Sequence, residues 1–390
     1  MNLTYQNLQS AVADALAFSF LGHFQPSEAN SPPYRVVPPT YAPPRKGDPP
    51  QYLTTETGEV RLDSPQSFAN RLEEVIASEN LTPSFNIVDG HGVVLVNSRQ
   101  LPHRVFDAAM RDSDLEGQPF FKSPLGADLR ATRPATATAL FRHAPETLLF
   151  GVWDSHSGGG IQVLRLARAI TARVFGTGGK LRPGGAQKSD PLNITKDVGL
   201  LYLDVNHQMT LDPNESVKGK KDKDKKETVK TYKPSDLGHG SVPASDSKDG
   251  VDVEDIILQG AIHLGVLRKY HFPVDNGKPS EEVDVAVRTA LLAMGIWAVQ
   301  SVATRGMWLR SGCDLVYQDL TWLLRYGGGK DEAFEVSLES ARKVLDEALA
   351  VLAGHNLNWE NTPITLKANK ELLKAIEISS TAIGIGEPED

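Results

Sequence analysis

A histidine and several aspartates stand close enough along the chain to suggest acid–base or metal chemistry. Asp154 and His156 could exchange a proton with a substrate, and Asp112 with Asp114 could offer carboxylates to a metal ion. Neither pair belongs to a wider catalytic pattern, because the sequence has no H-E-x-x-H motif and no paired metal-ligand spacing. The single cysteine, Cys313, excludes an intramolecular disulfide and a multi-cysteine zinc site. We therefore expect no catalytic residue, no metal and no cofactor.

The segment RLDSPQSFANRLEEVI (residues 61–76) places hydrogen-bonding groups at the start of a predicted helix. Ser64 is a good N-cap and Pro65 suits the first helical position. At about 100° per residue, Gln66 and Asn70 share the face opposite the apolar one, with Ser67 and Arg71 beside them. Free backbone N–H groups at a helix start favour an anion, and a sugar-phosphate backbone presents acceptors at regular intervals. The alternative is an ordinary capped amphipathic helix. Its apolar face would consist of Phe68, Leu72, Val75 and Ile76.

The segment LLFGVWDSHSGGGIQVLRLARAITARVFG (residues 148–176) is predicted to repeat this arrangement. We expect a strand over 147–153, a polar glycine-rich loop, and a helix over 161–175. The glycines fit neither a Walker loop nor a dinucleotide fingerprint, and the serine lacks the flanking glycines of a nucleophile elbow. What remains is a generic phosphate cradle backed by two arginines on one helical face, with a flexible loop and surface arginines as the alternative. The side chains concerned are Ser155, His156, Ser157, Arg165 and Arg168.

Basic residues are concentrated in one part of an acidic chain. The net charge is −8, yet residues 129–188 hold nine basic side chains and only two acidic ones. A basic zone on an acidic body is typical of a confined nucleic-acid track. A solvated basic face is the alternative.

Mixed strands and helices come first along the chain and an α-rich end comes last, which predicts an α+β fold with α-helical additions. Eight prolines in residues 32–50 predict an extended arm without regular structure. Asp89-Gly90 between two apolar runs predicts a hairpin. Residues 214–250 are poor in apolar side chains and are expected to be mobile, as a solvated loop. The other predictions are a helix and loop over 1–31, strands over 52–62 and 198–205, and helices over 281–303, 331–353 and 367–378.

These elements predict an N-terminal helix and proline-rich arm over 1–50, a core over 51–320 and a helical segment over 321–390. The first basic residue is Arg35, so the apolar stretch near the N-terminus lacks the positive region of a signal peptide. The longest apolar run, 290–299, is too short to span a bilayer. We expect a soluble cytoplasmic protein that has no membrane partner.

Four motifs occur in a fixed order along the chain: DSPQSFANRLEE (63–74), RDSDLEGQPFF (111–121), LLFGVWDSHSGGG (148–160) and WLRSGCDL (308–315). The first and third are specific, and the other two support them. Over about residues 55–320 the sequence resembles the backbone subunit of type I-G (formerly I-U) CRISPR effectors. That subunit belongs to the Cas-seven group of the RAMP superfamily.

The resemblance implies a modified RRM-like (ferredoxin-like) palm with inserted fingers and thumb segments. It also implies a non-catalytic subunit that stacks head to tail in several copies along the guide (cr)RNA of a Cascade surveillance complex. The guide bases would pair with a target DNA strand, and the partners would be other Cascade subunits and a recruited helicase-nuclease. The RNA contacts implied are Ser64, Gln66, Asn70, Arg71, Ser155, His156, Ser157, Arg165, Arg168 and, more weakly, Arg310.

Two other functions stay open. A RAMP-type endoribonuclease that processes guide RNA or cuts target RNA would use Asp154 and His156. A polymerising scaffold would use the basic zone to contact a partner protein. The sequence lacks the aromatic signature of an RRM that stacks bases, which favours gripping of the RNA backbone over base stacking.

Overall fold

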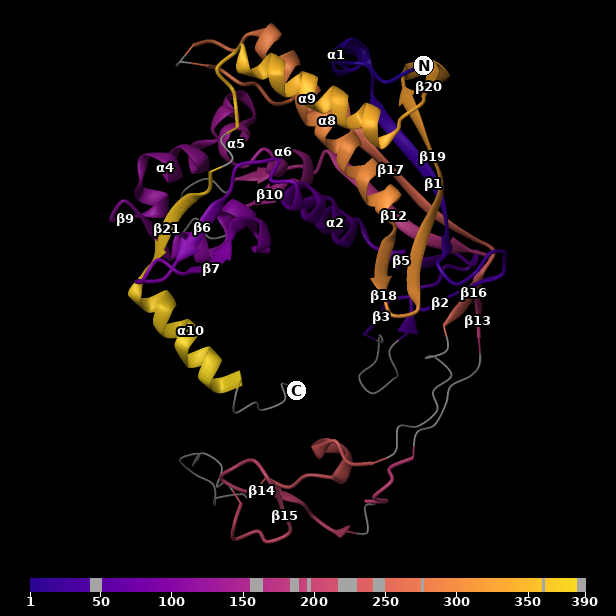
Figure 1. The fold of residues 1–390 in the computed structure, drawn as a ribbon, viewed down its shortest axis with the longest axis vertical. Helices are drawn as coiled ribbons and strands as arrows, with labels where there is room; N and C mark the ends of the chain where they lie inside the picture. Colours follow the sequence, from indigo (N-terminus) through magenta and orange to yellow (C-terminus); the bar gives the residue numbers. More distant parts are fainter. Residues whose placement is uncertain are drawn as a thin grey trace. The chain divides into compact units, whose positions relative to one another are not determined.

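The computed structural model describes residues 1–42, 51–154, 164–182, 189–194, 198–216, 230–240, 250–274, 277–359 and 362–383. The chain divides into two compact units (Figure 1). Unit 1 comprises Met1–Lys180 and Val251–Glu377, and unit 2 comprises Leu181–Gly250 and Ile378–Asp390. Helices and strands are mixed throughout, so the predicted α+β class is confirmed.

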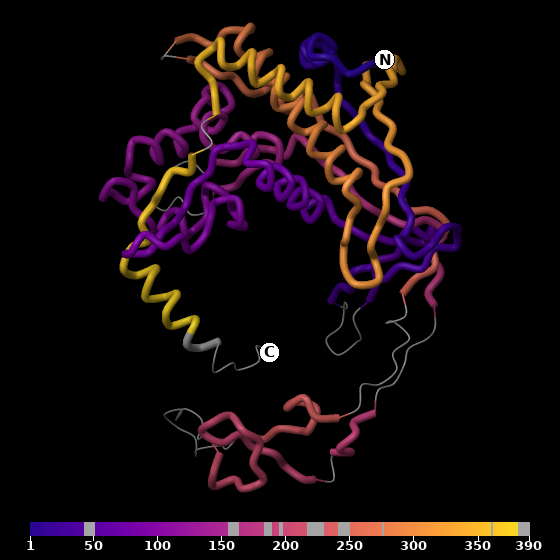
Figure 2. Tube along the Cα trace, in the orientation of Figure 1, coloured from indigo at the N-terminus to yellow at the C-terminus, as the bar shows by residue number. Residues whose placement is uncertain are grey.

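An antiparallel sheet of seven strands forms the centre of unit 1. Along the sheet the order is β18-β19-β1-β17-β12-β5, and β20 also pairs with β19. Figure 2 shows the N-terminal and C-terminal parts of the chain running side by side here, because β1 pairs with β19 along its whole length. The strands are β1 (Ala17–Pro26), β5 (Val60–Asp63), β12 (Ile170–Thr177), β17 (Asp255–His263), β18 (Met307–Arg310), β19 (Cys313–Arg325) and β20 (Asp331–Phe334).

Two helices connect the central strands and cover one face of this sheet. Helix α2 (Pro65–Ser78) lies in the chain between β1 and β12, and helix α8 (Glu281–Arg305) lies between β17 and β19. With the spatial order β19-β1-β17-β12, the connections follow the β-α-β-β-α-β pattern of ferredoxin-like sheets. Side chains of β1 alternate between buried and half-buried, so one face packs under the helices while the other stays partly open.

Helix α8 is the central helix of the core. By length and composition it could cross a membrane, but 94% of its most apolar window is buried inside the protein. The apolar run predicted from sequence is therefore part of a longer helix, and that helix is buried in the core of unit 1. Helix α9 (Leu338–Ala353) packs alongside it (Figure 1).

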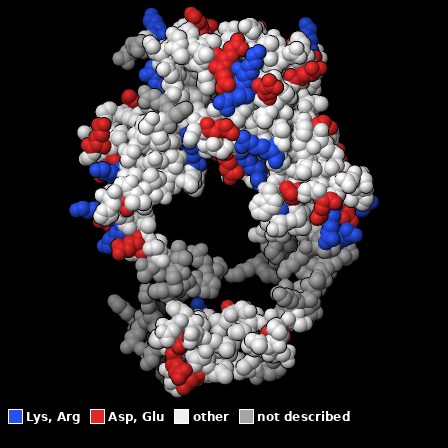
Figure 3. Space-filling view, viewed as in Figure 1, with Lys and Arg blue, Asp and Glu red and all other residues white. Residues whose placement is uncertain are grey.

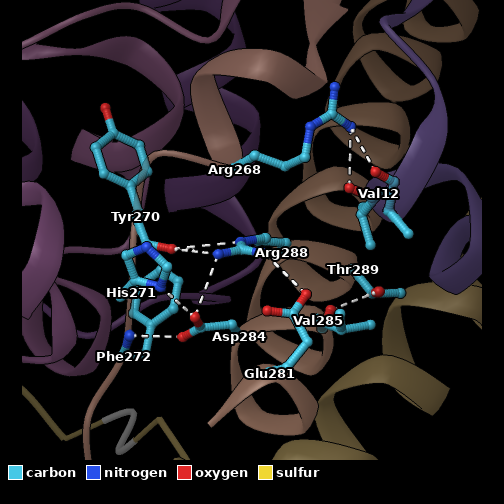
Figure 4. Close-up of polar contacts among 11 residues, drawn as sticks. Val12, Arg268, Tyr270, His271, Phe272, Glu281, Asp284, Val285, Arg288 and Thr289 are labelled. Atoms are coloured by element: carbon cyan, nitrogen blue, oxygen red, sulfur yellow. Dashed lines mark hydrogen bonds and ion pairs between the residues drawn. The ribbon is translucent and has the colours of Figure 1, made fainter. Parts of the chain in front are cut away.

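A buried carboxylate ties α8 to the chain that precedes it (Figure 4). Oδ1 of Asp284 accepts the Phe272 N–H at 2.8 Å, and Oδ2 accepts Arg288 Nη2 at 3.2 Å and the His271 ring. Arg288 Nη2 also donates to the Tyr270 carbonyl at 2.9 Å. Asp284 and Arg288 are both buried, so the charge of each side chain offsets the cost of burying the other.

A second, five-stranded sheet lies beside the main one in unit 1. Its strands β6 (Phe85–Val88) and β7 (Val94–Asn97) form the predicted hairpin, and Asp89 Oδ1 accepts the N–H groups of His91 and Val93 at 2.8 Å. Gly92 adopts φ +85°, which suits glycine in this turn. The remaining strands are β21 (Ile364–Ala368), β8 (Ser113–Leu115) and β9 (Gln118–Pro119).

The other α-helices and the strands outside the two larger sheets have the following bounds. The helices are α1 (Tyr5–Asp14), α3 (Ala108–Arg111), α4 (Pro124–Ala131), α5 (Thr138–His143), α6 (Glu146–Phe150), α7 (Leu264–Leu267) and α10 (Lys370–Ile383). The strands are β2 (Tyr34–Val36), β3 (Thr40–Tyr41), β4 (Gln51–Tyr52), β10 (Val152–Trp153), β11 (Arg165–Leu166), β13 (Lys180–Leu181), β14 (Tyr202–Leu203), β15 (Met209–Thr210) and β16 (Val251–Val253).

The prediction for the N-terminal 50 residues is wrong in two places. The loop expected after the first helix contains β1, a central strand whose apolar residues alternate with polar ones. The proline-rich arm contains β2 and β3, because Tyr34 to Val36 fall between proline pairs and can pair with β16. Proline has no backbone N–H, so it interrupts a strand ladder where a donor is needed at its position, and it is tolerated beside short or edge strands.

The helix predicted over 161–175 is also wrong. The described part of that range contains β11 and most of β12, where Ile170, Ala172 and Val174 point into the core while Thr171 and Arg173 do not. This alternation has the period of a strand, and β-branched residues favour it. The strand predicted over 147–153 is instead α6 followed by β10, with Gly151 at φ +75° between them.

Several predicted boundaries also shift. The helix over 281–303 is confirmed as α8, whereas those over 331–353 and 367–378 begin later, after β20 and β21. The strand over 198–205 is reduced to β14, and only the two ends of the 52–62 strand form, as β4 and β5. Residues 217–229 and 241–249 of the 214–250 segment lie outside the described residues, so its mobility stays a prediction.

Candidate nucleic-acid interface

The start of α2 is capped as its sequence predicts. The Ser64 Oγ accepts the Ser67 N–H at 3.2 Å, so this hydroxyl stabilises the helix start. The apolar side of the helix is buried through Phe68, Leu72, Val75 and Ile76. Gln66 and Asn70 are exposed, and they are the groups of this motif that a ligand can reach.

Arg71 ties α2 to the edge of the main sheet. Its Nε donates to Asp63 Oδ2 at 2.9 Å, and its Nη1 donates to the carbonyl of Trp308 on β18 at 3.1 Å. The Asp63 side chain is 2% exposed, and its Oδ1 also accepts the Ser64 N–H at 3.1 Å. Arg71 is therefore a structural ion-pair partner first, because a carboxylate this buried needs a cation.

Arg310 holds the same corner together from β18. It donates to the carbonyl of Leu62 at 3.1 Å and to the carbonyl of Val37 at 3.4 Å. The neighbouring Cys313 is fully buried, and burial raises the pKa of its thiol to about 12. The thiol is therefore an inert part of the core.

The opposite flank of α2 is joined to the second motif, residues 148–176, which contains the glycine-rich stretch. Arg104 forms an ion pair with Glu73 and donates through Nη1 to the carbonyl of Gly151 at 3.1 Å. Arg168 donates from Nε to the carbonyl of Phe150 at 3.2 Å. Burial and then the nearby Arg104 lower the pKa of Arg168. Arg168 therefore orders the backbone before β10.

Helix geometry places these two junctions on opposite flanks of α2. Arg71 and Glu73 are about 200° apart around the helix axis, so one reaches β18 and the other reaches the start of β10. The stripe between them carries Gln66, Asn70 and the acidic Glu74, all exposed. An anion is therefore favoured near the first turn rather than further along the helix.

Two exposed tryptophans flank this helix, and sequence reasoning missed both. Trp308 on β18 is 66% exposed and Trp153 on β10 is 62% exposed, whereas Trp297 and Trp322 are buried in the core. Each stands inside a motif noted above, but the type of residue alone gives no sign of exposure. Alternation from the buried neighbours Met307 and Val152 is the signal that could have found them.

The predicted cradle is rearranged in the structure. Arg165 lies on β11 and is exposed, directly opposite Trp153 in the β10–β11 pair, while Arg168 follows in the loop before β12. The two arginines therefore do not share a helical face as predicted. Ser155, His156 and Ser157 lie outside the described residues.

Two of the three acidic residues considered for acid–base or metal chemistry, Asp154 and Asp112, are paired with arginines. The buried Asp154 accepts from Arg130 Nε at 3.2 Å, and Asp112 pairs with Arg111 at 2.7 Å. Among the residues that the structure describes, no group of three or more histidine, cysteine or acidic side chains could hold a metal ion. Whether the protein is an enzyme stays open at this point.

The basic zone is spread over several elements rather than gathered on one helix. Its arginines lie on α4, α5, β11 and β12, and Arg173 pairs with Glu59 while also lying 4.5 Å over the Phe175 ring. Figure 3 shows basic and acidic side chains intermingled on the face it presents. Of this zone, Arg165 is exposed and has no hydrogen bond or ion pair to the described part of the chain.

Comparison with known proteins adds one finding. Residues 23–180 match the model of the family described as CRISPR-associated protein GSU0053. No curated protein matches the chain. The matched region includes the end of β1, α2, the second sheet's hairpin and the motif that ends at β12. The match covers less than half of the chain, and it supports a CRISPR-associated protein with a role in CRISPR defence.

Proposed function

We propose that this chain is a non-catalytic RNA-binding backbone subunit of a type I-G CRISPR surveillance complex. Its ligand is the guide RNA, along which several copies stack head to tail and expose the guide bases to target DNA. Other Cascade subunits complete the cytoplasmic complex, which recruits a separate helicase-nuclease. The family match supports the CRISPR assignment, and the following features support the RNA-binding role.

The observation that carries the proposal is the way α2 is mounted. Its exposed stripe starts at a helix N-terminus, where the helix dipole favours an anion, and arginine contacts join one flank of the helix to β18 and the other to the start of β10. Over its first two turns this stripe carries the neutral hydrogen-bonding groups of Gln66 and Asn70 next to arginines, which suits a sugar-phosphate backbone, because that ligand offers oxygen acceptors at a constant spacing. The ferredoxin-like strand order around it is compatible with an RRM-like palm.

A non-catalytic role is consistent with the pairing of the acidic residues. A general base needs a free lone pair within reach of its substrate, and the described carboxylates of the second motif are engaged by arginine. Asp154 lies beneath Arg130 with its side chain 6% exposed. Its contact is therefore with Arg130, and its burial keeps it away from RNA.

The test is to express the chain in a bacterium and to analyse the nucleic acid that copurifies with it. We expect RNA protected from nuclease in lengths that rise by a constant increment, because each subunit would cover the same stretch. The variant Gln66→Ala/Asn70→Ala removes exposed groups of α2 without touching its core, and it should shorten or abolish the ladder. RNA-free wild-type protein that also fails to bind a cognate guide would refute the proposal. Cleavage of RNA that is lost in Asp154→Asn would favour the endoribonuclease instead.

A further inference from the structure

The exposed tryptophans Trp153 and Trp308 have surroundings that point to one kind of ligand. Each stands on a short edge element whose neighbouring residue is buried: Val152 beside Trp153, and Met307 beside Trp308. The strand alternation therefore forces both indoles away from the core. An indole is the largest apolar side chain, and two-thirds exposure leaves its ring face free for a partner.

An arginine accompanies each indole. Arg165 is the direct cross-strand partner of Trp153 and is exposed on the same side of the β10–β11 pair. Arg71 donates to the backbone carbonyl of Trp308, and Arg310 lies two residues further along β18. At Trp153, a flat apolar ring beside the exposed Arg165 matches a nucleotide, whose base stacks while its phosphate meets the cation.

One helix holds both positions. Through Arg71, α2 fixes the strand of Trp308, and through Glu73 and Arg104 it fixes the residue two positions before Trp153. The exposed Gln66 and Asn70 lie between these flanks. We propose that Trp153 and Trp308 are stacking platforms for unpaired bases of single-stranded RNA, placed on either side of the backbone-binding stripe of α2.

This inference rests on the proposed RNA-binding function but adds a mode of contact that the sequence argued against. Stacking on an indole is tolerant of sequence, since every base has an aromatic face. Stacking also releases no counterions, whereas a phosphate contact does, so only the loss of a phosphate contact lowers the salt dependence of binding. The two kinds of contact therefore leave different signatures in a binding experiment.

The test compares two fluorescein-labelled single-stranded oligonucleotides of equal length, one of ordinary RNA and one with abasic sites. Wild-type protein should bind the RNA more tightly than the abasic strand. In Trp153→Ala and Trp308→Ala, RNA binding should weaken by about tenfold each, the range expected for one stacked base. Binding of the abasic strand should stay unchanged, and so should the slope of affinity against salt. Phenylalanine at either position should restore most of the affinity.

The matched control is Val94→Ala, since Val94 is 53% exposed on β7 and has no place in the proposed site. It should bind both strands like the wild type. Equal weakening on RNA and abasic strands would overturn the stacking assignment. Normal RNA binding by both tryptophan variants, with self-association lost in sedimentation, would assign the indoles to contacts between copies instead. A wild-type protein that binds neither strand would contradict the proposed function itself.

Discussion

Removal of Arg71 should destabilise unit 1 far more than removal of an exposed arginine. Arg71 is the cation for Asp63, whose side chain is 2% exposed, and it also satisfies the Trp308 carbonyl. Breaking a buried pair by deleting one partner leaves an uncompensated charge and costs about 3–5 kcal/mol. Because the Arg71 side chain is 22% exposed, water can reach the site, and we expect the lower end, about 3 kcal/mol.

Urea denaturation followed by tryptophan fluorescence measures this quantity. All five tryptophans lie within the ranges of unit 1, so the signal reports on the unit that contains the ion pair. Arg71→Ala should lower the midpoint strongly, and Arg165→Ala should change stability by less than about 0.5 kcal/mol. The double variant Asp63→Asn/Arg71→Leu should recover part of the loss, with a coupling of about 1–3 kcal/mol, because both charges are then gone.

An Arg71→Ala protein as stable as the wild type would refute the role of Arg71 as the cation that stabilises Asp63. That result would mean that Asp63 finds another partner or stays hydrated, and Arg71 would then be free for RNA. A destabilised Arg71→Ala protein has a practical consequence. Its loss of RNA binding could not be read as a lost phosphate contact, so Arg165 is the better position for testing charge.

Four further predictions follow from particular contacts. Arg165→Ala should reduce the slope of log affinity against log salt by about 0.7 on single-stranded RNA, measured by fluorescence anisotropy; an unchanged slope would remove Arg165 from the phosphate contacts. Asp284→Ala should cost about 3 kcal/mol in urea denaturation, since it removes the buried carboxylate of the Arg288 pair and leaves Arg288 only the exposed Glu281 among the described carboxylates, and a loss below about 1 kcal/mol would contradict this. Burial raises the pKa of Glu146 from 4.5 to about 7, so the folded state holds a proton that the unfolded state releases; stability should fall by at most about 3 kcal/mol as pH rises from about 4.5 to 7, and Glu146→Gln should remove that slope. Deletion of residues 218–230 should leave the thermal midpoint of unit 1 unchanged, and aggregation would show that the segment is structural.

Local features whose causes lie within a few residues could be predicted from the amino-acid sequence. The N-cap at Ser64 with Pro65, the buried face of α2 and the Asp89 turn depend on neighbours along the chain, and all three are as predicted. The central helix α8 was also predictable, because a long apolar segment of helix formers leaves few alternatives. The motifs were sufficient to indicate a CRISPR-associated protein, which the family match supports.

The contacts of the polar side chains became clear only in the folded arrangement. Arg71, Arg168 and Arg310 all looked like ligands for phosphate, yet each donates to a protein carbonyl, and the partners lie far away in sequence or in elements that were assigned wrongly. The segment over 161–175 has apolar residues that fit a helix or a strand, and pairing with β17 settles it as strand. Exposure of Trp153 and Trp308 likewise depends on which neighbours the sheet buries. The role of a charged or aromatic side chain depends on the groups that surround it in the folded protein. Those groups are distant in sequence, so a local sequence pattern does not reveal them.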